Sequence, residues 1–136
     1  MAERLERTCE LGADTFAARE ARRFVRQLLQ QHGTPDDIAD VVELLASELV
    51  TNAVRHGEEP RQLRFVIEDD QLTVSVSDGS EAPPKLQSPA PLEPHGRGLR
   101  LVAMLAERWG VNVRPGHGKD VWFSSRVPGA RIDSAH

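Results

Sequence analysis

The feature that most constrains this chain is a change in the period of its hydrophobic pattern close to Gly57. Before Gly57, apolar residues recur every three or four positions over about 14–56, which predicts two amphipathic helices. Over 61–77 apolar and polar residues alternate, which predicts two strands that turn at Asp69-Asp70. The chain is therefore expected to form a helical pair followed by a β-hairpin.

Capping signals set the bounds of the two helices. The first is expected to begin at Asp14 or Thr15 and to end at Gly33, after a strand candidate at 5–12. The second begins with Thr34-Pro35-Asp36-Asp37, which supplies a capping residue, a proline in the first turn and two acids that complement the helix dipole. It is expected to run to about His56.

The second half of the chain begins with a proline-rich stretch. Residues 79–95 carry five prolines, and a loop of this length in a small domain is typical of a lid or a binding loop. Gly96-Arg97-Gly98 is expected to open a third helix, which continues through Trp109 and ends at Gly110. Two strands follow, at about 111–114 and 119–127, and the tail 128–136 is expected to fray.

Composition excludes several classes of protein. At 136 residues the chain is expected to be a single domain, 1–136, with its core at about 10–127. The net charge of -4 argues against direct nucleic-acid binding. The sequence contains neither a stretch of eighteen apolar residues nor a signal peptide, so we expect a soluble cytoplasmic protein without membrane contact. Cys9 is the single cysteine, which excludes an internal disulfide and indicates a buried small hydrophobe.

Polar residues interrupt the apolar stripe of the second helix. Glu48, Asn52 and His56 stand at i, i+4 and i+8 and share one face. A helical projection places Asn52 and His56 within the stripe that contains Val41 and Leu45, with Glu48 at its border. Buried polar groups cost about 1–3 kcal/mol each unless they are paired. Either a bound ligand or metal, or an internal hydrogen-bond network, is therefore expected to meet this face.

A further polar group occupies a core position in the hairpin. Asp78 keeps the parity of Leu72, Val74 and Val76, so its carboxylate is expected to face the core. A buried carboxylate can accept a hydrogen bond from the exocyclic amine of a purine, and Gly79 beside it would let a flat ring approach. The sequence therefore offers Asp78 as a purine-reading group.

Further along the chain, Gly96-Arg97-Gly98 at a helix start suits a phosphate, although a tight turn without a ligand is equally consistent with it. Asn52 offers a neutral oxygen to Mg²⁺, and Glu48 lies one turn earlier, where it could act as a general base.

The sequence does not fit other phosphate-binding motifs or the motifs of hydrolases. Gly118-Lys119 resembles the end of a Walker loop, but Asp120 stands where Ser or Thr is required. The G-x-G at 96–98 lacks the preceding strand and the third small residue of a dinucleotide fingerprint. The histidines have no ligand-like spacing, and no serine stands in a G-x-S-x-G elbow.

Four motifs in order carry a resemblance to a known family: Glu48-x-x-x-Asn52-x-x-x-His56-Gly57, Asp78-Gly79, His95-Gly96-Arg97-Gly98-Leu99, and Gly118-Lys119-x-Val121-Trp122. Over about 10–127 the chain resembles the GHKL (Bergerat) ATP-binding fold, and specifically the small anti-sigma-factor serine/threonine kinases. The resemblance implies a two-layer α/β (α+β) sandwich, with a mixed, mostly antiparallel sheet and helices on one face. It also implies a flexible lid at 79–95.

By position, the resemblance implies a role for each matched residue. Glu48 corresponds to the catalytic base, Asn52 to the Mg²⁺ ligand and Asp78 to the adenine-recognising carboxylate. The remaining ATP-binding positions are Gly79, Gly96, Arg97, Gly98 and Leu99.

The chain also departs from the family pattern. The second glycine that usually follows Asp78-Gly79 is missing, and Asp120 replaces a usual threonine at the adenine site. Asp120 is expected to lie near Asp78, repel it and reduce the affinity for ATP.

The function implied by the resemblance is an ATP-dependent protein serine/threonine kinase with ATP and Mg²⁺ as cofactors. Its expected partners are an antagonist (anti-anti-sigma) protein, which it phosphorylates, and a sigma factor, which it sequesters; a homodimer is also suggested. The alternative is a binding switch without kinase activity that acts by protein capture alone. Structural roles are expected for three other groups: Trp109 and Trp122 pack against the domain, His56 satisfies a helix end, and Arg22, Arg23 and Arg26 form a solvated face.

Overall fold

The computed structural model describes residues 4–83 and 98–129, with backbone only at 98–100. The remaining ranges, 1–3, 84–97 and 130–136, lie outside the described residues. Along the chain the elements are β1 (Arg4–Leu11), α1 (Phe16–His32), α2 (Asp36–His56), β2 (Arg61–Glu68), β3 (Gln71–Asp78), α3 (Gly98–Leu105), β4 (Arg108–Arg114) and β5 (Gly118–Arg126).

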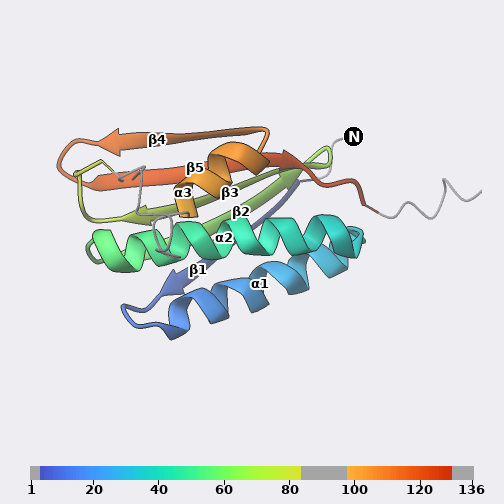
Figure 1. The fold of residues 1–136 in the computed structure, drawn as a ribbon, viewed down its shortest axis with the longest axis horizontal. Coiled ribbons are helices and arrows are strands. Elements are labelled where there is room, and N and C mark those ends of the chain that lie inside the picture. The colour runs from blue at the N-terminus through green and yellow to red at the C-terminus, as the bar shows by residue number, and fades with distance from the viewer. Residues whose placement is uncertain (1–3, 84–97, 130–136) are drawn as a thin grey trace, which may run out of the picture.

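The strands form one sheet in the order β1-β2-β3-β5-β4, and every neighbouring pair is antiparallel. Figure 1 shows two layers, with α1 and α2 lying side by side along one face of the sheet and α3 beside α2. This arrangement agrees with the predicted sandwich, although the described strands contain no parallel pair.

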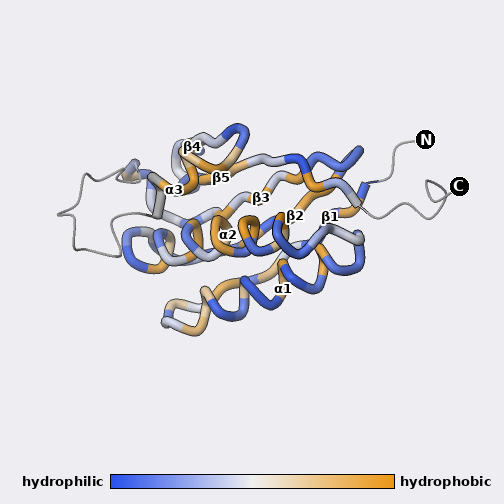
Figure 2. The backbone as a smooth tube through the Cα atoms, turned by 45° about the vertical axis from the view of Figure 1, so that its right-hand side comes forward, coloured by the Kyte–Doolittle hydropathy of each residue, from blue (hydrophilic) through white to orange (hydrophobic). Residues whose placement is uncertain are grey.

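The core lies between the helices and the sheet. The period-two residues of the hairpin are all buried, as are their neighbours in β5, and apolar residues of α1 and α2 cover them. In Figure 2 the orange segments of α2 and of the central strands face each other. Burial of each such side chain contributes about 1.5–3 kcal/mol. The buried sheet residues are Leu63, Phe65, Ile67, Leu72, Val74, Val76, Val121 and Phe123.

Three of the local signals at the element ends have the expected geometry. Gly33 adopts the left-handed conformation (φ 82°) and its N–H donates to carbonyls of the last turn of α1. Asp36 and Asp37 occupy the first turn of α2. Asp69 and Asp70 have φ values of 54° and 62°, which fit the two-residue hairpin turns that match the strand twist. These three predictions are confirmed. The capping role expected at the start of α2 is wrong: Pro35 is the N-cap and not part of the first turn, and the buried hydroxyl of Thr34 has no hydrogen-bond partner among the described residues.

The prediction of a helix through Trp109 to Gly110 is wrong. Helix α3 ends at Leu105, and β4 begins at Arg108, where Trp109 pairs in register with Phe123 of β5. Gly110 lies across from Trp122, and a Cβ at this glycine would come within 2.9 Å of the indole ring. Close packing on this tryptophan, not a helix end, accounts for Gly110.

The buried face of α2 is also rotated relative to the prediction. The alanines Ala39, Ala46 and Ala53 are buried on it, whereas Val41 is 39% exposed. His56, the last helical residue, is exposed. The prediction that His56 lies within the core-facing stripe is therefore wrong, because small alanines let α2 approach the core on a neighbouring face.

The expected solvated face of α1 holds an inter-helix ion cluster. Arg26 forms salt bridges to Asp36, Asp40 and Glu43 of α2. Hydrogen bonding to Asp40 raises the pKa of Arg26. Arg26 therefore joins the two helices, contrary to the expectation for it, while Arg22 and Arg23 are exposed as predicted.

Cys9 and the start of the C-terminal tail are not placed as predicted. Cys9 is a free thiol but only half-buried, and burial raises its pKa. Pro128 and Gly129 are half-buried, and a Cβ at Gly129 would meet His32, so the described start of the tail lies on the domain. Among the described helices, none combines the length and the apolarity that a membrane crossing requires.

Candidate functional site

Asp78 is the last residue of β3, and the structure places it where its parity predicts. The residue is 2% exposed. Its Oδ1 accepts hydrogen bonds from the backbone N–H of Ser80 (2.7 Å) and of Glu58 (3.3 Å). The carboxylate is thus buried and oriented by two backbone donors, one of which belongs to the segment that follows α2.

Lys119 faces Asp78 from the neighbouring strand. The two residues are paired in register across β3 and β5, so their side chains lie on the same face of the sheet. Lys119 is also only 2% exposed. Its Nζ lies 3.2 Å from Oδ1 and 3.1 Å from Oδ2 of Asp78, and it donates to the carbonyl of Ser80 (3.2 Å). The site therefore contains a buried ion pair.

Glycines allow the backbone to close around this ion pair. A Cβ at Gly57 would lie 2.5 Å from Cγ of Asp78, so the carboxylate packs directly on the end of α2. Gly118 has φ 96°, and a Cβ there would lie 1.9 Å from the carbonyl oxygen of Asp78. At Gly79 a Cβ would lie 2.2 Å from the carbonyl oxygen of Glu59. In the described structure Gly79 therefore makes room for the protein's own backbone.

Arg61 binds the C-terminal end of α2, against which Asp78 packs. Its guanidinium donates from Nε to the carbonyl of Ala53 (2.9 Å) and from Nη2 to that of Gly57 (3.0 Å). A cation at the C-terminus of a helix also complements the helix dipole. Arg61 is 8% exposed, and its Nη1 has no hydrogen-bond partner among the described residues. This arginine fixes the backbone that leads to Glu58.

Asp120 does not lie beside Asp78, so the predicted repulsion between them is wrong. Asp120 pairs in register with Ser77, which places its side chain on the opposite face of the sheet from Asp78. There it forms a salt bridge to Arg114 at 3.1 Å. The charge that faces Asp78 is the cation of Lys119.

Glu48 and Asn52 lie on α2 in the direction away from Asp78. Both residues are half-buried, and their separation of four positions puts them on one face of the helix. With a rise of about 1.5 Å per residue, Asn52 lies about 7.5 Å and Glu48 about 13.5 Å from Gly57 along the helix axis. The structure thus places Asp78 of β3 against the end of α2, with Asn52 and then Glu48 further along that helix.

The glycine turn is only partly described. Gly96 and Arg97, and with them most of the predicted lid at 79–95, lie outside the described residues. Gly98 and Leu99 form the start of α3, which packs against α2. The predicted helix start is confirmed within the described residues.

The described residues contain no group of three or more His, Cys, Asp or Glu that could hold a metal ion. This finding concerns clusters of such side chains only, and Mg²⁺ bound through a single amide oxygen is a different kind of site. Magnesium keeps several waters and uses one or two protein oxygens together with substrate phosphates. The half-buried amide of Asn52 is a donor of that kind.

The sequence pattern assigns no role to Lys119, although one of the four motifs contains it, and it does not identify Arg61; both residues are buried and contact the site. A parity argument could have found Lys119, because it alternates with Val121 and Phe123 on the buried face of β5. No comparable signal existed for Arg61, since its contacts depend on the position of the end of α2.

Comparison with known proteins agrees with this architecture. Residues 11–125 match the family model described as a histidine kinase-like ATPase domain. Among solved structures, the chain is similar to the RsbU and RsbW domains of Rv1364c from Mycobacterium tuberculosis, with a TM-score of 0.70 and 20% sequence identity. The match covers 94% of this chain and 34% of the Rv1364c chain, so this protein spans about a third of the length of the Rv1364c chain. No protein of curated function matches. The predicted Bergerat fold is confirmed.

Proposed function

The chain belongs to the family of histidine kinase-like ATPase domains, and on that premise we propose that it is a serine/threonine protein kinase of the anti-sigma-factor type. In this proposal it binds Mg-ATP, phosphorylates a small antagonist protein, and sequesters a sigma factor when the antagonist is phosphorylated. Membership of an ATPase family implies ATP binding; the protein partners are inferred from the resemblance of the four motifs.

The observation that best supports the proposal is the order of polar groups along α2. A buried carboxylate, Asp78, stands at the C-terminal end of the helix, with Asn52 and then Glu48 progressively further from it. A nucleotide laid along this helix would place its base near Asp78, its phosphates near Asn52 and its terminal phosphate toward Glu48. The same order of roles is implied by the family resemblance.

The remaining ATP-binding positions that we propose flank the same helix. Gly98 and Leu99 begin α3, which packs on α2, so the N–H groups of its first turn are available to phosphate oxygens. Gly96 and Arg97 precede them in the chain and would extend this turn with a cation. Gly79 follows Asp78 and would form part of the base end.

In the proposed reaction, the serine hydroxyl of the antagonist attacks the γ-phosphorus of ATP in line. The new Oγ–P bond forms as the bond to the β–γ bridging oxygen breaks, and ADP leaves. Glu48 orients the hydroxyl and accepts its proton. When bound, Mg²⁺ would neutralise charge on the phosphate oxygens, and Asn52 would hold it through the amide oxygen.

Incubation with Mg-ATP and candidate antagonist proteins, followed by mass spectrometry, tests the kinase function. The expected product is a phosphoserine on the antagonist, formed in proportion to ADP. Sigma-factor capture can be followed in the same mixture by co-purification, and size measurement in solution checks the homodimer. Persistent absence of phosphate from every antagonist that binds would contradict the kinase function.

A binding switch without phosphate transfer is the second candidate. It is favoured by one observation: the carboxylate of Asp78 is already paired with the ammonium of Lys119. The same mixtures separate the two functions, because a switch forms complexes with the antagonist or sigma factor that contain no phosphoserine.

A further inference from the structure

Lys119 brings a cation to the position where a purine would be read. We propose that Lys119 is a specificity-determining residue of the nucleotide site: its ammonium takes the acceptors of Asp78 that the exocyclic amine of adenine would use. ATP is then bound without readout of that amine. This inference rests on the proposed function, and it names the feature of the nucleotide that the site ignores.

The hydrogen-bond capacity of the carboxylate supports the proposal. A carboxylate oxygen offers about two lone-pair sites. Oδ1 of Asp78 already lies within hydrogen-bond distance of three donors, on Ser80, Glu58 and Lys119. Oδ2 lies 3.1 Å from the same ammonium. Oδ1 therefore has no acceptor site left for an incoming amine, and at Oδ2 the amine would have to share the oxygen with the ammonium of Lys119.

The hydrogen-bond donors of Lys119 are also fully used in this pairing. An ammonium has three N–H donors, and Nζ of Lys119 has three acceptors within 3.2 Å: both oxygens of Asp78 and the carbonyl of Ser80. Lys119 is among the largest fully buried side chains in the described structure. A buried ammonium that loses its carboxylate is strongly unfavourable. Lys119 is therefore expected to retain Asp78 when a nucleotide enters.

The backbone around the pair limits any rearrangement. The carboxylate packs against Gly57, where a Cβ would come within 2.5 Å of Cγ of Asp78. The main chain of Asp78 packs on Gly118, at the start of β5, where a Cβ would lie 1.9 Å from the carbonyl oxygen of Asp78. Because both sides are in direct contact, Asp78 has little room to turn away from Lys119 and toward a base.

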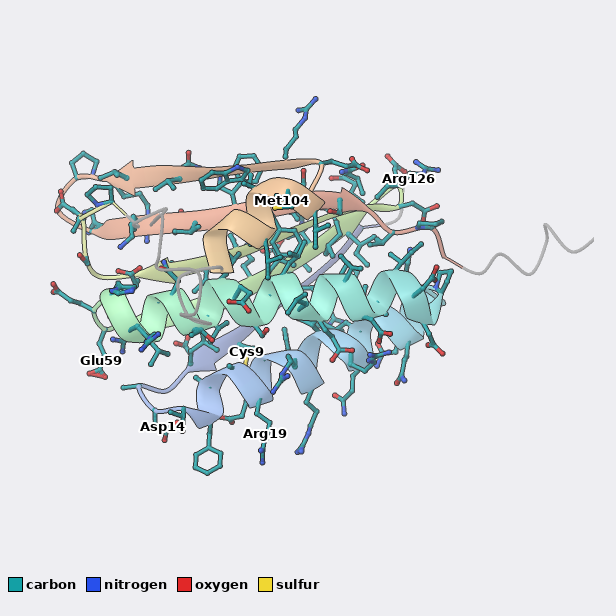
Figure 3. All side chains as sticks on the ribbon, in the orientation of Figure 1. Cys9, Asp14, Arg19, Glu59, Met104 and Arg126 are labelled. Carbon is teal, nitrogen blue, oxygen red and sulfur yellow. The ribbon has the colours of Figure 1, made fainter. Side chains whose placement is uncertain are left out.

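Calorimetry with two nucleotides tests the proposal. Mg-ATP carries an amine at C6 of the purine, and Mg-ITP carries a carbonyl there. The full chain is compared with Lys119→Thr, which removes the ammonium and opens space. Lys119→Met also removes the ammonium but keeps an apolar stem packed, and it serves if the threonine variant does not fold. Arg126→Thr is the matched control, since it removes an exposed cation from the other end of β5 (Figure 3).

The unmodified chain and Arg126→Thr are expected to bind the two nucleotides within about threefold of each other. Either Lys119 variant is expected to prefer ATP by about tenfold or more, which corresponds to about 1.4 kcal/mol. A tenfold preference for ATP in the unmodified chain, or no preference in both Lys119 variants, would overturn the inference and leave the proposed function standing. If neither nucleotide binds to any of the proteins, the proposed ATP function fails and the inference fails with it.

Discussion

Replacement of Arg61 by methionine should destabilise the domain much more than replacement of a comparable surface arginine. Arg61 is buried at the start of β2, and its guanidinium donates to the carbonyls of Ala53 and Gly57 at the end of α2. Methionine preserves most of the apolar stem of the side chain. The substitution therefore removes mainly the two hydrogen bonds and the charge at the helix terminus.

The magnitude follows from these contacts. A hydrogen bond to a charged group contributes about 1.5–3 kcal/mol, so the two together contribute about 3–6 kcal/mol. Relief of the burial of a guanidinium offsets part of this, particularly since Nη1 has no partner among the described residues. The free energy of unfolding is expected to fall by about 2–4 kcal/mol.

Chemical denaturation followed by circular dichroism measures this loss, with Arg64→Met as the matched control. Arg64 lies on the same strand, but it is exposed and pairs with Glu6 at the surface, where a salt bridge contributes about 0–1 kcal/mol. Equal losses in Arg61→Met and Arg64→Met would refute the view that Arg61 stabilises the end of α2.

Three further predictions concern other parts of the molecule. Glu48→Gln is expected to retain Mg-ATP binding by calorimetry but to transfer no phosphate to an antagonist, because an amide cannot accept the serine proton; unchanged transfer would remove Glu48 from the mechanism. Asp78→Asn is expected to lower the free energy of unfolding by about 3–5 kcal/mol, since it leaves the buried ammonium of Lys119 without its counter-ion; denaturation measures this, and a loss under about 1 kcal/mol would contradict it. Hydrogen bonds from Arg64 and then Arg4 lower the pKa of Glu6 to about 2 from 4.5. The folded-state pKa lies below the unfolded one, so the stabilisation is present above about pH 4.5 and is lost as the pH falls through about 2. NMR titration of the Glu6 carboxyl would show this, and a midpoint near 4.5 would not fit.

Local signals in the sequence predicted most of the fold. Gly33, the acids that begin α2 and the Asp69-Asp70 turn each act within a few residues, so the elements that they bound could be predicted without knowledge of the tertiary structure. The burial of Asp78 followed from strand parity in the same way. The spacing of Trp109 and Gly110 also fits a helix, so the sequence pattern predicts the wrong element there, and only pairing with β5 makes that segment a strand.

The error about Asp120 shows how one residue of register decides the chemistry of the site. A motif places Asp120 near the adenine end, but alternation in an antiparallel pair directs successive side chains to opposite faces. Asp78 is opposite Lys119 and Ser77 is opposite Asp120, so the residue that meets the buried carboxylate is a cation, and the anion lies half-buried on the other face of the sheet. Lysine is rarely buried unless it is paired, so residue type alone argues against placing Lys119 in the core. Parity argues for it, because Val121 and Phe123 occupy the same buried face of β5. In this site the geometry of the strand pair outweighs the usual preference of the side chain, and the charge that meets Asp78 changes sign as a result.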